Sequence, residues 1–173
     1  MADVVEGLPI PPHLAGEFYA WLWWATEDRG GVFDLGEPVG RVDVWVDDRL
    51  AFRHPGENKV SAVMTGENPS TTLESRAALA GGKVLQELRI GIRRDEREFS
   101  VTLKGPPMHF AQAKLPQVVT EGGEEAMLDR MHLYDELSFV VAGLFRAYCR
   151  ARTASDWETE HLSALRRWVV GSA

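Results

Sequence analysis

The seven residues from Phe18 to Trp24 contain five aromatic side chains, three of which are tryptophans. At about 100° per residue, an α-helix places Trp21 and Trp24 on one face with Phe18, whereas Tyr19 and Trp23 point well away from that face. A helix that is aromatic around most of its circumference cannot keep one side in water. We therefore expect this helix to be buried against the core on one side and against something further on the other.

Strand patterns dominate the middle of the chain. Val42, Val44 and Val46 alternate with polar residues, Asp47-Asp48 is a good turn sequence, and Leu50 and Phe52 predict a returning strand. Further strands are expected over 32–35, 60–65 and 108–114.

The clearest hairpin is the segment from Lys83 to Lys104. Val84, Leu88, Ile90 and Ile92 alternate along its first strand, interrupted by Gln86, and Phe99, Val101 and Leu103 return on the same face. Between this hairpin and the strand at 60–65 we expect a short helix. Its sequence begins at Asn68-Pro69-Ser70, Thr71 and Glu74 fit a capping box, and Gly81-Gly82 ends it.

Helices are expected at both ends of the chain. Pro12 precedes a helix over 13–28, and a long helix over 124–152 carries an apolar row spaced by three and four. A last helix over 155–168 starts with a capping box formed by Ser155 and Glu158. The row on the long helix comprises Met127, Met131, Tyr134, Leu137, Val141, Leu144 and Tyr148.

These elements predict an α+β fold. We expect an antiparallel sheet of about five to seven strands, an N-terminal aromatic helix, a short capping helix, and a long C-terminal helix followed by a shorter one. The length fits one domain over 13–173 after an irregular lead-in over 1–12.

Composition indicates a cytoplasmic protein. The single cysteine, Cys149, excludes an internal disulfide framework, and the first six residues lack the basic and apolar regions of a signal peptide. No apolar stretch is long enough for a membrane span. The net charge of −7 disfavours a generic nucleic-acid binder, although the hairpin is locally basic.

Three blocks of this sequence, in this order, resemble the C-terminal half of the recombination-associated RdgC family. They are residues 16–24, residues 76–84 with the hairpin strand that includes 98–103, and residues 133–137. The resemblance covers residues 14–152 and rests on structural rather than catalytic motifs. The N-terminal half of that family has no counterpart in this sequence.

The resemblance implies a non-enzymatic, nucleoid-associated protein that binds double-stranded DNA with little sequence preference. It also implies self-association and the restraint of a RecA-type recombinase. Ring closure around DNA does not transfer, because the half of the family that helps close the ring is not matched here.

Basic side chains of the hairpin are the candidate DNA contacts. A ribbon of this kind can lie along phosphates, each contact adding a salt-sensitive increment to the affinity. The alternative is a self-neutralising face, since Glu87, Glu96 and Glu98 lie among these cations. The candidates are Lys83, Arg89, Arg93, Arg94, Arg97 and Lys104.

Aromatic and apolar side chains of two helices are the candidate protein interface. For the three tryptophans of this set, simple core packing is the alternative and stacking on bases is a third interpretation. The candidates are Tyr19, Trp21, Trp23, Trp24, Tyr134, Leu137, Leu144 and Tyr148.

We expect no enzyme, no cofactor, no metal site and no small-molecule substrate. Asp43, Asp47 and the Glu57–Lys59 segment only faintly resemble the carboxylate and lysine spacing of metal-dependent nucleases. Two hypotheses remain. One is an RdgC-like, self-associating protein on duplex DNA in the cytoplasm or nucleoid, and the other is a protein-interaction module or subunit without DNA binding of its own.

Overall fold

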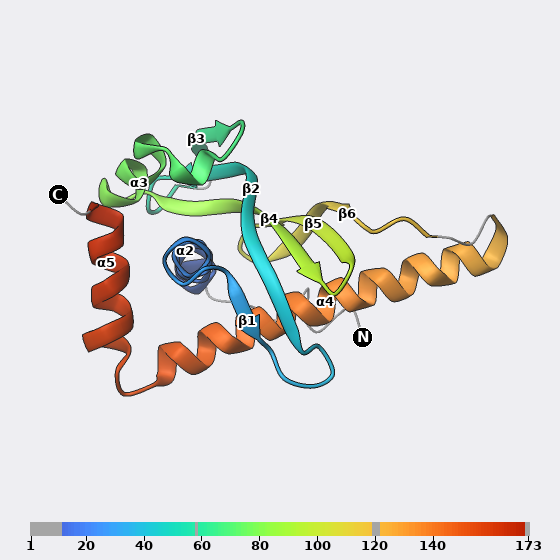
Figure 1. Cartoon of the computed structure of the whole chain (residues 1–173). Helices are drawn as coiled ribbons and strands as arrows, with labels where there is room; N and C mark the ends of the chain where they lie inside the picture. Colours follow the sequence, from blue (N-terminus) through green and yellow to red (C-terminus); the bar gives the residue numbers. More distant parts are fainter. Residues whose placement is uncertain (1–11, 58, 119–121, 172–173) are drawn as a thin grey trace.

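A computed structural model of the chain describes residues 12–57, 59–118 and 122–171 (Figure 1). The expected lead-in lies outside the described residues apart from Pro12, which is the first residue of helix α2 (Pro12–Asp28).

The centre of the molecule is an antiparallel sheet with the strand order β1-β2-β4-β5-β6. Strand β3 also pairs with β2, at residues 49–53, whereas β1 pairs with residues 41–43 at the other end of β2. The α+β prediction is therefore confirmed. The strands are β1 (Val32–Asp34), β2 (Arg41–Arg53), β3 (Val60–Thr65), β4 (Val84–Arg94), β5 (Arg97–Lys104) and β6 (His109–Lys114).

Helices cover one side of this sheet. Helix α2 packs against β2 and β4, and it also contacts α4 (Gly123–Thr153) and α5 (Leu162–Val170). Figure 1 shows α2 end-on, with α4 passing across the molecule on one side of it and α5 standing on another. The short helix α3 (Leu73–Ala80) lies against α5.

One continuous core joins the sheet to these helices. Aromatic residues of α2 meet inward-facing residues of β2, β4 and β5, and the C-terminal two thirds of α4 closes the same cluster. Leu88, Ile90 and Ile92 are fully buried, as the alternation predicts. The next inward residue is Leu85 rather than Val84, because the pairing register of β2 and β4 shifts between Ala51 and Phe52.

The turn predicted at Asp47-Asp48 is wrong. Strand β2 runs unbroken from Arg41 to Arg53, with Val46 paired to Ile90 and Leu50 paired to Leu88. Three residues of β2, Asp47 to Arg49, therefore stand opposite the single Arg89 of β4. A β-bulge bends a strand without reversing it, so polar residues that favour turns also fit here.

Two helix starts also differ from the prediction. Thr72, not Thr71, caps α3, and its hydroxyl oxygen accepts from the Ser75 N–H at 3.3 Å. The last helix begins with a π-helical turn, η2 (Trp157–His161), and Ser155 does not cap it. A short 3₁₀ turn, η1 (Pro69–Thr71), precedes α3.

Candidate interaction surface

Arg89, the central DNA candidate, is buried in the sheet and bound to carboxylates of the same chain. It is 5% exposed. Its Nε lies 3.2 Å from Asp47 Oδ2 and 3.3 Å from Asp48 Oδ1, and its Nη1 donates to Gln112 Oε1 at 3.2 Å. The bulge in β2 brings both aspartates to this one arginine. The expectation that Arg89 faces a phosphate is therefore corrected.

Glu87, two residues earlier on β4, holds a second cluster. Its Oε1 pairs with Lys104 Nζ at 2.8 Å, and its Oε2 pairs with Arg49 Nε at 2.9 Å. The Glu87 side chain is 5% exposed, whereas those of Lys104 and Arg49 are 44% and 35% exposed. A cross-strand pairing of hairpin acids with hairpin bases, which was the alternative to phosphate contact, is confirmed at this position.

The remaining arginines of the hairpin are paired as well. Arg93 bonds to Asp43 of β2 at 2.9 Å. Arg94 and Arg97 share Glu136 of α4, at 2.9 and 2.8 Å, so this carboxylate fastens the hairpin turn to the helix. The charge pattern along the sequence could not predict this role of Glu136, because Arg94 and Arg97 lie about 40 positions away from it.

Lys83 alone among the six candidates has no ion pair with any described residue. It is half-buried and lines a shallow hollow of about 920 Å³ between α2, the loop after β2 and the start of β4. Arg53 lines the same hollow, but its Nη1 donates to the Glu57 carbonyl at 3.0 Å. The structure does not bring the six candidate cations together on one free surface.

The charge clusters predict a pH-dependent contribution to stability. Burial by itself raises the pKa of Glu87, but hydrogen bonds and charges from Lys104 and Arg49 outweigh burial, and the pKa lies below its ordinary 4.5. Ionised Glu87 therefore stabilises the fold above that ordinary value, and this contribution is lost as the pH falls through the lowered pKa.

We expect Glu87→Gln to lower the free energy of unfolding by about 1–3 kcal/mol at pH 7, since it weakens two charge-assisted hydrogen bonds. Urea denaturation should show that the variant and wild type differ less in free energy of unfolding at pH 3.5 than at pH 7. Glu98→Gln, at an exposed site on β5, is the control and should change stability little. An equal difference at both pH values would contradict the assignment.

The aromatic side chains of α2 are enclosed by the chain itself. Tyr19, Trp23 and Trp24 are at most 1% exposed and Trp21 is 5% exposed. Leu137, Leu144 and Tyr148 of α4 are equally buried, and Tyr134 is half-buried beside Phe110 at a ring distance of 6.0 Å. For the seven buried residues the expectation of contact with another protein is corrected, because they pack in the core of the same chain. For Tyr134 it stays a prediction.

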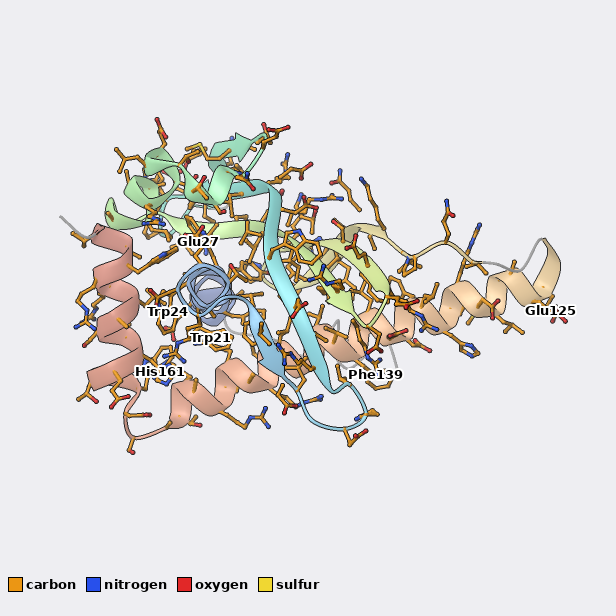
Figure 2. All side chains as sticks on the ribbon, viewed as in Figure 1. Trp21, Trp24, Glu27, Glu125, Phe139 and His161 are labelled. Atoms are coloured by element: carbon orange, nitrogen blue, oxygen red, sulfur yellow. The ribbon has the colours of Figure 1, made fainter. Side chains whose placement is uncertain are left out.

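The second side of the aromatic helix is covered by α5 and η2. The Trp23 ring meets the Trp168 ring edge-on at 4.8 Å, and His161 lies between Trp24 and Trp157, at ring distances of 6.1 and 5.8 Å. Figure 2 shows Trp21, Trp24 and His161 in this layer, with Glu27 nearby. A helix buried all round was correctly expected, but the covering segment belongs to the same chain.

Burial holds two tyrosines of this layer in their neutral form. The pKa of Tyr148 is raised by burial and by its 2.8 Å hydrogen bond to Glu17, and burial raises the pKa of Tyr19 as well. Neither hydroxyl is poised for acid–base chemistry near neutral pH.

Of the ten large hydrophobic residues that are exposed in the described part of the chain, four lie on α4, more than on any other element. The helix has 31 residues, and its N-terminal part extends beyond the sheet (Figure 1). Met127, Leu128 and Met131 there are 63%, 47% and 52% exposed, and Phe139 further along is 41% exposed. Figure 2 labels Glu125 near the free end of α4 and Phe139 near its middle. The predicted row continues from the core into solvent, and its first two members, Met127 and Met131, are the exposed ones.

Leu128 and Phe139 were not identified from the sequence as exposed apolar residues. The apolar row that predicted the long helix follows the side that is buried where the helix meets the core. A second row on the opposite side has fewer apolar members, and only the tertiary structure shows that Leu128 and Phe139 in this row are left exposed. Large exposed apolar side chains that gather on one element are typical of interaction sites.

The nuclease-like carboxylates are engaged in other contacts. Asp43 binds Arg93, and Asp47 binds Arg89 and accepts from the Ser100 hydroxyl at 2.9 Å. Among the described residues, no group of three or more His, Cys, Asp or Glu side chains is placed to hold a metal ion. Within the same residues, no helix combines the length and the apolar character that crossing a membrane requires.

Comparison with known proteins adds no relative. No family model, no curated protein and no solved structure matches the chain.

Proposed function

We propose that this chain is a non-enzymatic protein-interaction module that docks through the exposed side of α4. The observation that carries the proposal is the projection of α4 beyond the sheet with Met127, Leu128 and Met131 in solvent. Water-exposed apolar side chains of this size favour burial against a partner, at roughly 25 cal/mol for each Å² removed from water.

The core supports this choice of surface. The aromatic residues of α2 are already covered by α5, so they are not available to a partner while the fold is intact. No segment within the described part of the chain covers the exposed part of α4 in this way, and methionine side chains adapt readily to a partner's shape.

Association with duplex DNA, which the resemblance to the RdgC family implies, stays a prediction. Five of the six candidate cations already bind carboxylates of the same chain, and a phosphate would have to displace them. We therefore expect the purified chain to bind a 30-base-pair duplex weakly or not at all at 100 mM salt. Fluorescence anisotropy of a labelled duplex, titrated at 20 and 100 mM salt, measures this, and tight binding at 100 mM salt would favour the DNA-associated function.

The docking surface is tested by photo-cross-linking in cells. A photoreactive phenylalanine analogue is placed at position 131, and the matched control carries it at position 73 on α3, where Leu73 is 81% exposed. We expect a discrete adduct from position 131 and none from position 73, because only the first position lies in the proposed surface.

The mass of the adduct identifies the partner, and Leu128→Glu in the position-131 protein should abolish it. Adducts of equal yield from both positions, or no adduct from position 131, would contradict the proposal. A location in the cytoplasm or at the nucleoid stays part of the prediction.

A further inference from the structure

Seven residues form a single row along the outer side of α4. Their spacing is four, three, four, four, three and four, so the row reads the same in both directions with Asp135 at its centre. At about 100° per residue they fall within an arc of about 80°. Five of them are exposed, whereas Asp135 and Ala142 are half-buried and Ala142 also contacts the core. The row comprises Glu124, Leu128, Met131, Asp135, Phe139, Ala142 and Arg146.

We propose that the partner of this row is a second copy of the chain, with the two α4 helices antiparallel and Asp135 at the twofold axis. This inference rests on the proposed function and names its partner. A twofold axis requires each residue to meet the residue at the same distance on the other side of the axis. Met131 then meets Phe139 of the other copy, and Leu128 meets Ala142.

Charge selects the antiparallel direction. Glu124 and Arg146 lie at opposite ends of the row, are both exposed, and have no ion pair with any described residue. In the antiparallel arrangement each Glu124 faces an Arg146, once at each end of the contact. A parallel arrangement would place glutamate beside glutamate and arginine beside arginine, and like charges in contact are unfavourable.

The arrangement also predicts a weak dimer. Three large apolar side chains from each copy, with a pair of aspartates at the axis, are less than a permanent interface contains, and small interfaces of this kind are transient. Removing the repulsion at the axis should tighten the dimer. We expect Asp135→Asn to lower the dissociation constant about fivefold, the size of one unfavourable charge contact in bulk water.

A charge swap tests the partner and the direction together. Glu124→Arg alone and Arg146→Glu alone each create two like-charge contacts, so sedimentation equilibrium of the full chain should show weaker dimers for both variants. The double variant restores opposite charges at both ends, and its dimer should recover to near wild type. Only a contact between two copies of this row allows that recovery.

Disulfide trapping tests the register. With Cys149→Ser in every protein, Asp135→Cys should form a disulfide-linked dimer under mild oxidation, because the two positions coincide at the axis. Met131→Cys alone should not form the disulfide, because residue 131 of one copy faces residue 139 of the other. The two copies of residue 131 are then eight positions apart, or about 12 Å along the helix, which is too far for a disulfide. Mixing Met131→Cys with Phe139→Cys should restore the linked dimer.

The outcomes separate this inference from the proposed function. A monomer that is unaffected by all charge variants, with no linkage through position 135, overturns the second copy as partner. If photo-cross-linking at position 131 then gives an adduct that is not twice the chain mass, the docking surface stands with another protein on it. Linkage at position 135 no faster than at a control Leu73→Cys would also overturn the arrangement.

Discussion

Trp23→Ala is expected to lower the free energy of unfolding by about 3–5 kcal/mol, the loss typical of a buried tryptophan. The Trp23 side chain has no exposed surface, and its ring contacts those of Phe52 and Trp168. Its indole N–H donates to Glu27 Oε1 at 2.7 Å, and the other oxygen of Glu27 pairs with Arg76 of α3 at 2.8 Å. One side chain therefore ties α2 to the sheet, to α3 and to α5.

Urea denaturation followed by far-UV circular dichroism measures this loss. The matched control is Trp45→Ala on β2, because Trp45 is 38% exposed and should cost less than half as much. Hydrogen exchange adds a second measurement. The amides of α5 should exchange faster in Trp23→Ala, since Trp168 loses its contact. If Trp23→Ala and Trp45→Ala lowered the free energy of unfolding equally, the α2 layer would not be the centre of the core.

Gly31→Ala is expected to destabilise the fold by about 2–5 kcal/mol, through a backbone clash added to a backbone strain. Gly31 has φ of +68°, and a Cβ at this position would lie 2.1 Å from the carbonyl oxygen of Val44. The approach is fixed, because the Val44 N–H donates to the Gly31 carbonyl at 2.7 Å. The glycine thus lets the end of α2 lie directly against β2.

Gly30→Ala is an unusually close control. Gly30 has φ of +74°, but no heavy atom lies within 4 Å of the position its Cβ would take. This variant should cost only the left-handed strain, about 1–2 kcal/mol. Thermal unfolding of the two variants at the same pH separates the clash from the strain. If they melt at the same temperature, the close approach of Gly31 to Val44 is not a constraint on the fold.

The predicted elements that matched the structure are those with strong local periodicity. The hairpin of β4 and β5, the aromatic helix α2 and the long helix α4 follow from alternation or from three-and-four spacing, which depend only on neighbours in sequence. The Asp47-Asp48 turn was wrong for a related reason. Two aspartates favour a turn locally, but their pairing with Arg89, about 40 residues away, holds β2 in one strand with a bulge.

The candidate site depended on contacts between segments that are far apart in the sequence. Arginines of the hairpin could be placed on a strand from the sequence, but whether they face phosphate or carboxylate depends on partners from distant segments. Asp43, Asp47 and Glu136 supply these carboxylates from β2 and α4. The apolar row of α4 was visible in the sequence, but which of its members stay in water was not.

The crowding of aromatic residues in α2 determined by itself that this helix is buried on all sides, because no arrangement of five such side chains within two turns leaves a polar face. It did not determine what covers the second side. The tertiary structure decided that α5 of the same chain does so, and that four exposed apolar side chains gather on α4 instead. The reason is that burial is a sum over contacts between segments far apart in the chain, whereas periodicity reports only the direction in which each side chain leaves its own helix.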